Sequence, residues 1–210
     1  MNSTQTLIMN ESKHVVFNYT YTDDNELLLS NARVSSVSLL LNNMDSPIPN
    51  DFKKPTGYDE WAGFYDAYIV NKVEIECTFI NTGNQPIIVG VACLPENINT
   101  SPGGITWTKL KNFPSNNFVN KQAMLTANNG SVSSTTINIE CDLAELSNLK
   151  SQYSSSVKFS SKFDLFPPES LNGIIYAINS ENVAAPIGTA ATFKLNIKFY
   201  TTVFQVKLLV

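Results

Sequence analysis

The chain has 210 residues, of which 43% are hydrophobic and 15% charged, and its 14 basic and 18 acidic residues leave a net charge of −4. Charged residues this scarce exclude a disordered chain and a coiled coil, because both depend on many charged side chains. Ser, Thr and Asn together supply 63 residues, and these types disfavour helix interiors and favour strands and turns. The composition therefore predicts one mostly-β domain at 13–210, preceded by a flexible segment at 1–12.

Apolar and polar residues alternate with a period of two from end to end, which is typical of strands with one buried face. The first alternating stretch places Val15, Phe17, Tyr19 and Tyr21 on one face. Similar stretches follow at 36–41, 69–79, 87–93, about 121–127, 132–141, 155–160, 174–178 and 189–208.

Three of these stretches predict more than a strand. NTGNQP at 81–86 is a hairpin signal between 69–79 and 87–93. Both faces of 87–93 are apolar or small, so we expect this strand to be covered on both sides. In 189–208 the apolar residues move from odd to even positions beyond Tyr200, which predicts a bend or bulge near 200–203.

Helical signals are short and lie in connections. Residues 57–68 allow about two turns, and so does the stretch 142–150, where Asp142 can cap the helix. Eight or nine strands with long loops at 43–68, 95–120 and 142–155 fit an all-β fold, an antiparallel two-sheet jelly-roll sandwich with one or two short helices. Loops of this length on a rigid sandwich usually serve ligand binding or subunit contact.

No pattern predicts catalysis. The one histidine, His14, is expected to be an ordinary surface or edge residue, and neither a GxSxG nor a P-loop motif is present. The chain lacks a signal-peptide pattern and any apolar run of 18 residues. We therefore expect no enzyme activity, no cofactor and no membrane insertion.

Metal and thiol chemistry are also not expected. The acidic groups Asp23-Asp24-Asn25-Glu26 and Asp59-Glu60 contain oxygen ligands suited to calcium, but neither has the spacing of a known loop motif. A solvated turn is favoured over a cation at a subunit contact. The cysteines, Cys77, Cys93 and Cys141, have no CxxC spacing and are expected to be buried thiols in a reducing compartment.

Aromatic residues gather at Tyr58, Trp61, Phe64, Tyr65 and Tyr68. The last four follow the i, i+3, i+4, i+7 spacing of a helix, so the favoured interpretation is a short amphipathic turn that packs on the sandwich. The alternatives are a platform that stacks on sugars and a subunit contact.

Charge is distributed unevenly along the chain. The first 105 residues carry 12 acids and five bases, whereas the rest carries nine bases and six acids. Lys194 and Lys198 share the outward face of the last strand, which makes that face basic. Such a face fits phosphate, although an ordinary solvated surface is the favoured interpretation.

The segment 57–94 resembles the capsid proteins of circovirus-like small circular single-stranded DNA viruses. In that group a GxDxW loop leads through two tyrosines into a long strand, an F.N.G turn and a second hydrophobic strand. The matching residues here are Gly57, Asp59, Trp61, Tyr65, Tyr68, Val70, Lys72, Phe79, Asn81 and Gly83.

The resemblance implies a single jelly-roll coat protein of the virion, 60 copies of which assemble with one another into a T=1 icosahedral shell around the genome. Members of the group usually begin with an arginine-rich arm that binds nucleic acid, whereas this sequence starts MNSTQTL and its first base is Lys13. Lys13, Lys194 and Lys198 are therefore the candidates for a weak nucleic-acid-binding surface. The alternative function is a β-sandwich carbohydrate-binding or attachment module, with the loop around Trp61 as its platform.

Overall fold

The computed structural model describes residues 12–21, 26–29, 33–49, 51–94, 119–127, 132–147, 158–180 and 190–206. The strands in this part of the chain are β1 (Lys13–Tyr21), β2 (Glu26–Leu28), β3 (Val34–Leu40), β4 (Tyr65–Asn81), β5 (Ile87–Leu94), β6 (Val119–Leu125), β7 (Ser133–Asp142), β8 (Ser161–Lys162), β9 (Asn172–Asn179) and β10 (Ala190–Val206). The helices are α1 (Tyr58–Phe64) and α3 (Leu143–Leu146). Neither of these two helices is long and apolar enough to cross a membrane.

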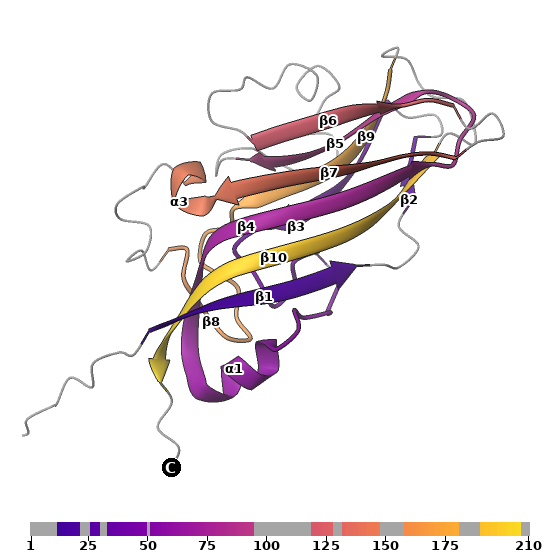
Figure 1. The fold of residues 1–210 in the computed structure, drawn as a ribbon. Coiled ribbons are helices and arrows are strands. Elements are labelled where there is room, and N and C mark those ends of the chain that lie inside the picture. The colour runs from indigo at the N-terminus through magenta and orange to yellow at the C-terminus, as the bar shows by residue number, and fades with distance from the viewer. Residues whose placement is uncertain are drawn as a thin grey trace, which may run out of the picture.

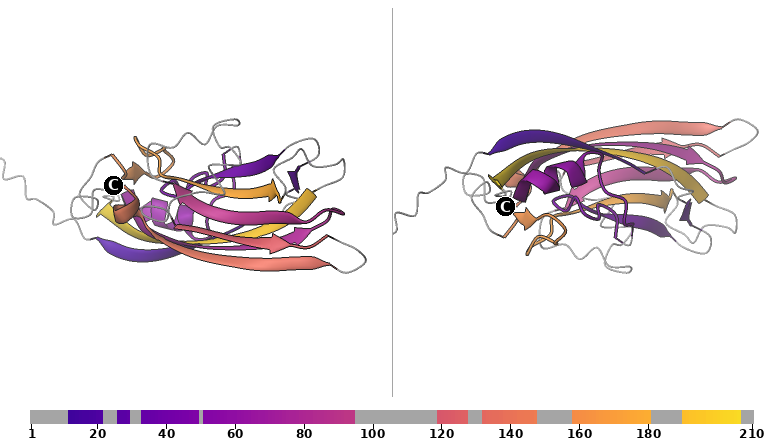
Figure 2. Two further views of the ribbon diagram at one scale, coloured as in Figure 1. Left: turned by 90° about the horizontal axis from the view of Figure 1, so that it is seen from above. Right: turned by 90° about the horizontal axis from the view of Figure 1, so that it is seen from below.

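The strands form two antiparallel sheets packed face to face (Figures 1 and 2). The large sheet has the order β1-β10-β4-β7, with β2 added beside β10 and β8 beside β4, and the small sheet has the order β3-β9-β5-β6. Leaving out the two short additions, the first strand pairs with the last, the second with the second last, and so on inward to β5 with β6. A long hairpin wound into two sheets has this pairing, which confirms the predicted jelly roll.

The core lies between the sheets and follows the predicted alternation. On β4, the alternate residues from Val73 to Phe79 are buried, and on β10 the same holds from Phe193 to Phe199. They meet buried residues of the small sheet such as Val91 in one hydrophobic cluster.

The small sheet is buried on its outer face as well. Ala92, Leu94, Ile174, Tyr176 and Ile178 form a second buried cluster there, with every member fully covered. The prediction that the strand at 87–93 is covered on both sides is therefore confirmed.

The predicted hairpin at 81–86 is wrong, because the chain changes sheets there. β4 belongs to the large sheet and β5 to the small one. The buried side chain of Asn81 shapes this crossing: its amide donates to the carbonyls of Gln85 and Thr126, both at 2.8 Å, and its Oδ1 accepts from the Gly83 N–H at 2.9 Å. A turn motif predicts that the chain reverses, but it does not specify which sheet the next strand joins.

The predicted irregularity near 200–203 is present, but the extra residue is on the partner strand. Tyr200 pairs with Lys72 and Thr201 with Val70, so Asn71 on β4 is the inserted residue. β10 keeps its own alternation, since Thr201 remains buried, so the apolar residues at even positions beyond Tyr200 do not turn a new face toward the core. On β4 the bulge turns Val70 toward the core.

The helix predictions are each confirmed in part. α1 ends at Phe64, and Tyr65 and Tyr68 lie on β4, so the helical spacing of the aromatic residues does not describe one helix face. α3 has the predicted cap: the Asp142 carboxylate accepts from the backbone N–H groups of the first turn, at 2.8 and 3.2 Å.

Two further strand assignments are corrected. In the stretch predicted at 155–160, residues 158–160 form a turn, and pairing with β4 begins only at Ser161. The alternation pattern also missed β2, whose three residues are too few to show an alternation.

Some predictions concern residues outside the described part of the chain. These residues are 1–11, most of the loop predicted at 95–120, and 148–157.

Gly90 should not tolerate a side chain. A Cβ at this position would lie 2.4 Å from both Cζ and the hydroxyl oxygen of Tyr176. The Tyr176 side chain crosses the outer face of the small sheet, and its hydroxyl donates to Asn120 Oδ1 at 2.9 Å. We expect Gly90→Ala to lower the free energy of unfolding by about 1–3 kcal/mol, because the fully buried ring has little room to move. Urea unfolding measures this. Gly63→Ala in α1, where nothing lies within 4 Å of the new Cβ, is the control, and equal losses for the two variants would contradict the prediction.

The cysteines should be unreactive in the folded chain. All three are buried free thiols, as predicted. Burial raises the pKa of Cys77, and a hydrogen bond with Cys141 together with burial raises the pKa of Cys93. Because the thiolate is the reactive form, we expect a thiol reagent to modify none of them in native buffer and all three in urea. Fast labelling of the native chain would contradict this.

Candidate functional site

Three of the five clustered aromatic residues are packing residues. Tyr58 and Tyr68 are buried around Phe163, with ring centroids 5.0 and 5.1 Å from its ring. The Tyr58 hydroxyl accepts from the backbone N–H of Asp164 at 2.8 Å. Burial raises the pKa of Tyr58 above its ordinary value and that of Tyr68 to about 12. Tyr65 is buried as well.

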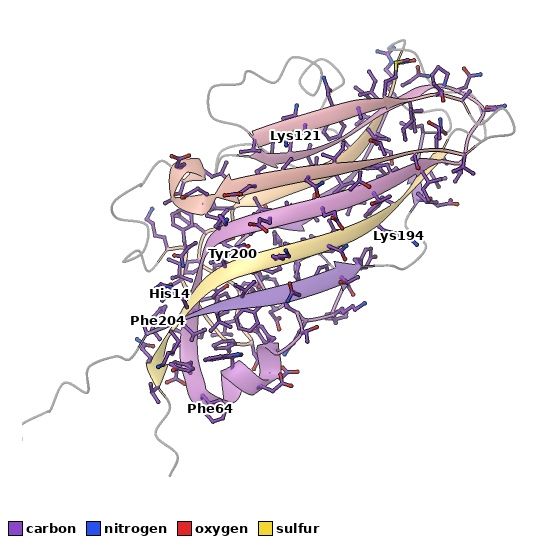
Figure 3. The ribbon with its side chains drawn as sticks, in the orientation of Figure 1. His14, Phe64, Lys121, Lys194, Tyr200 and Phe204 are labelled. Atoms are coloured by element: carbon purple, nitrogen blue, oxygen red, sulfur yellow. The ribbon has the colours of Figure 1, made fainter. Side chains whose placement is uncertain are left out.

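The other two aromatic residues differ from these and from each other. Trp61 is half-buried, with its ring 5.6 Å from that of Tyr65, and it packs against the core. Phe64 is 58% exposed at the end of α1 (Figure 3). The five residues therefore form no open stacking platform, and only Phe64 presents most of its side chain to the outside.

Phe64 belongs to a group of exposed apolar side chains at one end of the sandwich. Leu165 and Phe166 follow β8, which pairs with Ala67 and Tyr68 near the start of β4. Val206 pairs with Tyr65, which is next to Phe64. We call Phe64, Leu165, Phe166 and Val206 the apolar tip.

Hydrogen bonds and ion pairs hold the backbone of the tip. The Ser161 hydroxyl donates to the carbonyl of Leu165, and the Leu165 N–H donates to the carbonyl of Lys162. The Lys54 ammonium joins Asp164 at 2.6 Å to Asp59 of α1 at 3.2 Å. These contacts raise the pKa of Lys54, the bond with Asp164 most of all. Lys54 thus connects α1 to the turn after β8.

The three candidate lysines do not form one surface. Lys194 and Lys198 are exposed on the outer face of the large sheet, as predicted. Lys13 starts β1 opposite Val203, and its position in the alternation is that of the core-facing Phe17 and not that of the outer face. Lys13 is nevertheless exposed, because it is the first residue of β1, near the apolar tip. It lies away from Lys194 and Lys198.

The outer face of the large sheet is not basic, although the sequence of β10 alone predicts it. β4 contributes Glu74 and Glu76 beside the lysines, and β7 contributes Glu140. Asn196 donates to Glu76 at 2.9 Å. The alternation along one strand gives the charges of that strand, whereas the charge of the face depends on which strands become neighbours.

Glu74 is at the centre of a charged network on this face. It accepts from the Tyr200 hydroxyl at 2.8 Å and from Lys72 at 3.0 Å, and Lys198 lies 3.8 Å away. Lys72 also pairs with Glu140 at 3.1 Å and lies over the Tyr200 ring, 4.2 Å from its centroid. The bond from Tyr200, followed by that from Lys72, lowers the pKa of Glu74.

A shallow hollow of about 500 Å³ lies beside this network. Its side chains come from five strands and are mainly amides, carboxylates and lysines: Asn18, Thr20, Glu74, Glu76, Lys121, Asn138, Glu140, Asn196 and Lys198. Because carboxylates and ammonium groups are interspersed, the hollow presents no concentrated positive charge to a phosphate chain.

The residues weighed for catalysis or metal binding are not gathered into a site. His14 is exposed on the edge strand β1, where Nδ1 lies 3.0 Å from the Thr202 hydroxyl. Asp59 pairs with Lys54, and residues 23–25 lie outside the described part. Within the described ranges, no group of three or more His, Cys, Asp and Glu side chains is placed to hold a metal.

The sequence interpretation missed Leu165 and Phe166 as surface residues. They stand directly before the Pro167–Pro168 pair, which indicates a turn and hence a surface segment, and alternation does not detect this. Their position at the same end of the sandwich as Phe64 has no sequence signal, because it depends on the pairing of β8 with β4.

Comparison with known proteins shows similarity in fold alone. No protein-family model matches the sequence, and no curated protein matches it. A chain from the semi-empty virus-like particle of the giant freshwater prawn Macrobrachium rosenbergii nodavirus is 9% identical, with a TM-score of 0.51 over 99% of this chain and 89% of that chain. A chain of Cucumber Leaf Spot Virus is 10% identical, with a TM-score of 0.51 over 94% of this chain and 52% of that chain.

The network on the large sheet should stabilise the protein in a pH-dependent way. Because the pKa of Glu74 is lowered in the folded state, its contribution is fully present above the unfolded value of about 4.3 and is lost as the pH falls through the lower folded value. We expect Glu74→Gln to lower the urea midpoint at pH 7, with a deficit that shrinks below about pH 4. Tyr200→Phe, which removes the first donor, should weaken this pH dependence. A deficit that is constant with pH would contradict the assignment.

Proposed function

We propose that the protein is a viral capsid subunit whose function is to assemble with copies of itself into a closed shell around a genome. The main support is the jelly roll itself. The similarity to the chain of the nodavirus particle extends over 99% of this chain and 89% of that chain. Jelly-roll sandwiches recur in capsid and lectin domains. The protein therefore acts as a structural component of the virion and not as an enzyme.

The finer form of the proposal rests on the resemblance of residues 57–94 to circovirus-like coat proteins. It makes residues 13–210 one jelly-roll domain after a flexible segment at 1–12. Sixty copies then form a T=1 shell around circular single-stranded DNA. Such a closed shell needs subunit contacts whose rotations close. The weak nucleic-acid surface at Lys13, Lys194 and Lys198 belongs to this form of the proposal.

The charges on the large sheet support weak binding of the genome through that face. Lys198 lies 3.8 Å from Glu74, and Lys72 is paired with two carboxylates. Since phosphate binding releases counterions in proportion to the cations used, a face with balanced charges contributes little.

A carbohydrate-binding module is the alternative, and the packing of the aromatic residues weakens it. Sugar stacking needs exposed rings, whereas Tyr58, Tyr65 and Tyr68 are buried and Trp61 is half-buried. The polar hollow on the large sheet has one aromatic residue in its lining, Tyr19, and this residue is buried in the core.

Assembly of the purified full chain tests the proposal. We expect light scattering and negative-stain microscopy to show closed particles of uniform size, because each copy offers the same contacts to its neighbours. The concentration and ionic strength should be varied, so that weak contacts are sampled. A chain that remains monomeric throughout and binds to a glycan array would contradict the proposal and support the alternative.

A further inference from the structure

The large exposed apolar side chains of the described residues gather mainly at the two ends of the sandwich. One group is the apolar tip, where β4 begins. The other, Leu28, Met124 and Val132, lies near the end of β4 at Asn81. The 17 residues of β4 separate the two groups by roughly 55 Å at about 3.3 Å per residue. The groups are therefore separate surfaces.

The tip is built from segments that strand pairing places at one end of β4. Its four residues come from the end of α1, the turn after β8 and the end of β10, and the pairings of β4 with β8 and β10 bring these segments together. Phe64 is followed directly by the buried Tyr65. The Leu165 carbonyl accepts from the Ser161 hydroxyl, and the Leu165 N–H donates to the Lys162 carbonyl. Side chains on such a fixed backbone lose little further freedom on binding.

Charges of both signs surround the tip. Asp59 and Glu60 lie on α1, Asp66 follows Tyr65, and Asp164 precedes Leu165. The bases at the same end are Lys13, Lys54 and Lys162. Four carboxylates disfavour an anionic membrane or a nucleic acid, whereas a partner with the same mixed rim can place lysines opposite carboxylates.

We infer that the apolar tip docks on the apolar tip of a second copy of this chain, in a two-fold contact. In such a contact the same patch serves on both partners. The apolar centres then exclude water, and the charged rims meet with opposite signs. The inference rests on the proposed function, because it names one of the contacts by which copies associate, but pairwise association is measured separately from particle formation.

Two substitutions test the surface in a matched way. Phe166 at the tip and Met124 near the opposite end are each 62% exposed. We expect Phe166→Ser to weaken self-association of the full chain about tenfold or more in sedimentation velocity, the loss typical of a central contact residue. Met124→Ser should leave it unchanged. Both variants should keep the wild-type urea midpoint, because neither side chain is buried.

Thiol crosslinking tests the two-fold geometry. Since the three native cysteines are buried, Phe166→Cys adds a single exposed thiol among the residues that the structure describes. We expect a short bifunctional thiol reagent to give covalent dimers of Phe166→Cys and none of Met124→Cys. Crosslinking of a mixture of the two variants to each other, without dimers of Phe166→Cys, would show a head-to-tail contact and overturn the inference.

The remaining outcomes separate the inference from the proposed function. Particles that form equally well with Phe166→Ser would overturn the tip contact and leave the capsid function standing. Tip-dependent pairs that never form particles would support the contact and refute the shell. Binding of the wild type to phosphatidylcholine vesicles that is lost with Phe166→Ser, without self-association, would assign the tip to lipid and overturn the inference.

Discussion

The pairing of β4 with β10 is the interaction on which the rest of the structure depends. These two strands of 17 residues run antiparallel in the middle of the large sheet, and their alternation gives the sheet one apolar face along most of its length. Burying a large apolar side chain stabilises a fold by about 1.5–3 kcal/mol, so a continuous row from each strand is a major source of stability. β1 and β7 extend this face on either side, and the small sheet covers it.

Polar side chains form hydrogen bonds where these long strands have a bulge or end in a connection. The bulge at Asn71 is closed by a 2.8 Å hydrogen bond from its amide to the Thr202 hydroxyl. At the other end of β4, Asn81 ties together the crossing to the small sheet. Asn42 connects the segment after β3 to the chain before β9, since its amide donates to Glu169 and its oxygen accepts from Leu171. Buried amides of this kind are tolerated because their hydrogen bonds are satisfied.

The surfaces left by this framework differ in chemistry. The outer face of the large sheet carries carboxylates and lysines in close pairs, which suits contact with water more than a strong hold on phosphate. The apolar tip is instead hydrophobic, because four large side chains remain exposed there. Strand pairing and hydrogen bonds hold the backbone that carries them. Apolar patches of this kind usually mark an interaction site.

The amino-acid sequence by itself determined what depends on neighbours along the chain. The strands around Phe17, Ile75 and Ile197, the Asp142 cap and the burial of the cysteines all follow from local alternation, capping and composition. The tertiary structure decided what depends on neighbours in space. It placed Glu74 beside Lys198 and moved Tyr65 from a helix to a strand. It also separated Lys13 from the other lysines and placed Phe166 at the same end of the sandwich as Phe64. The physical reason is that a period of two selects which side chains turn inward, whereas only the pairing of strands far apart in sequence decides what each side chain meets.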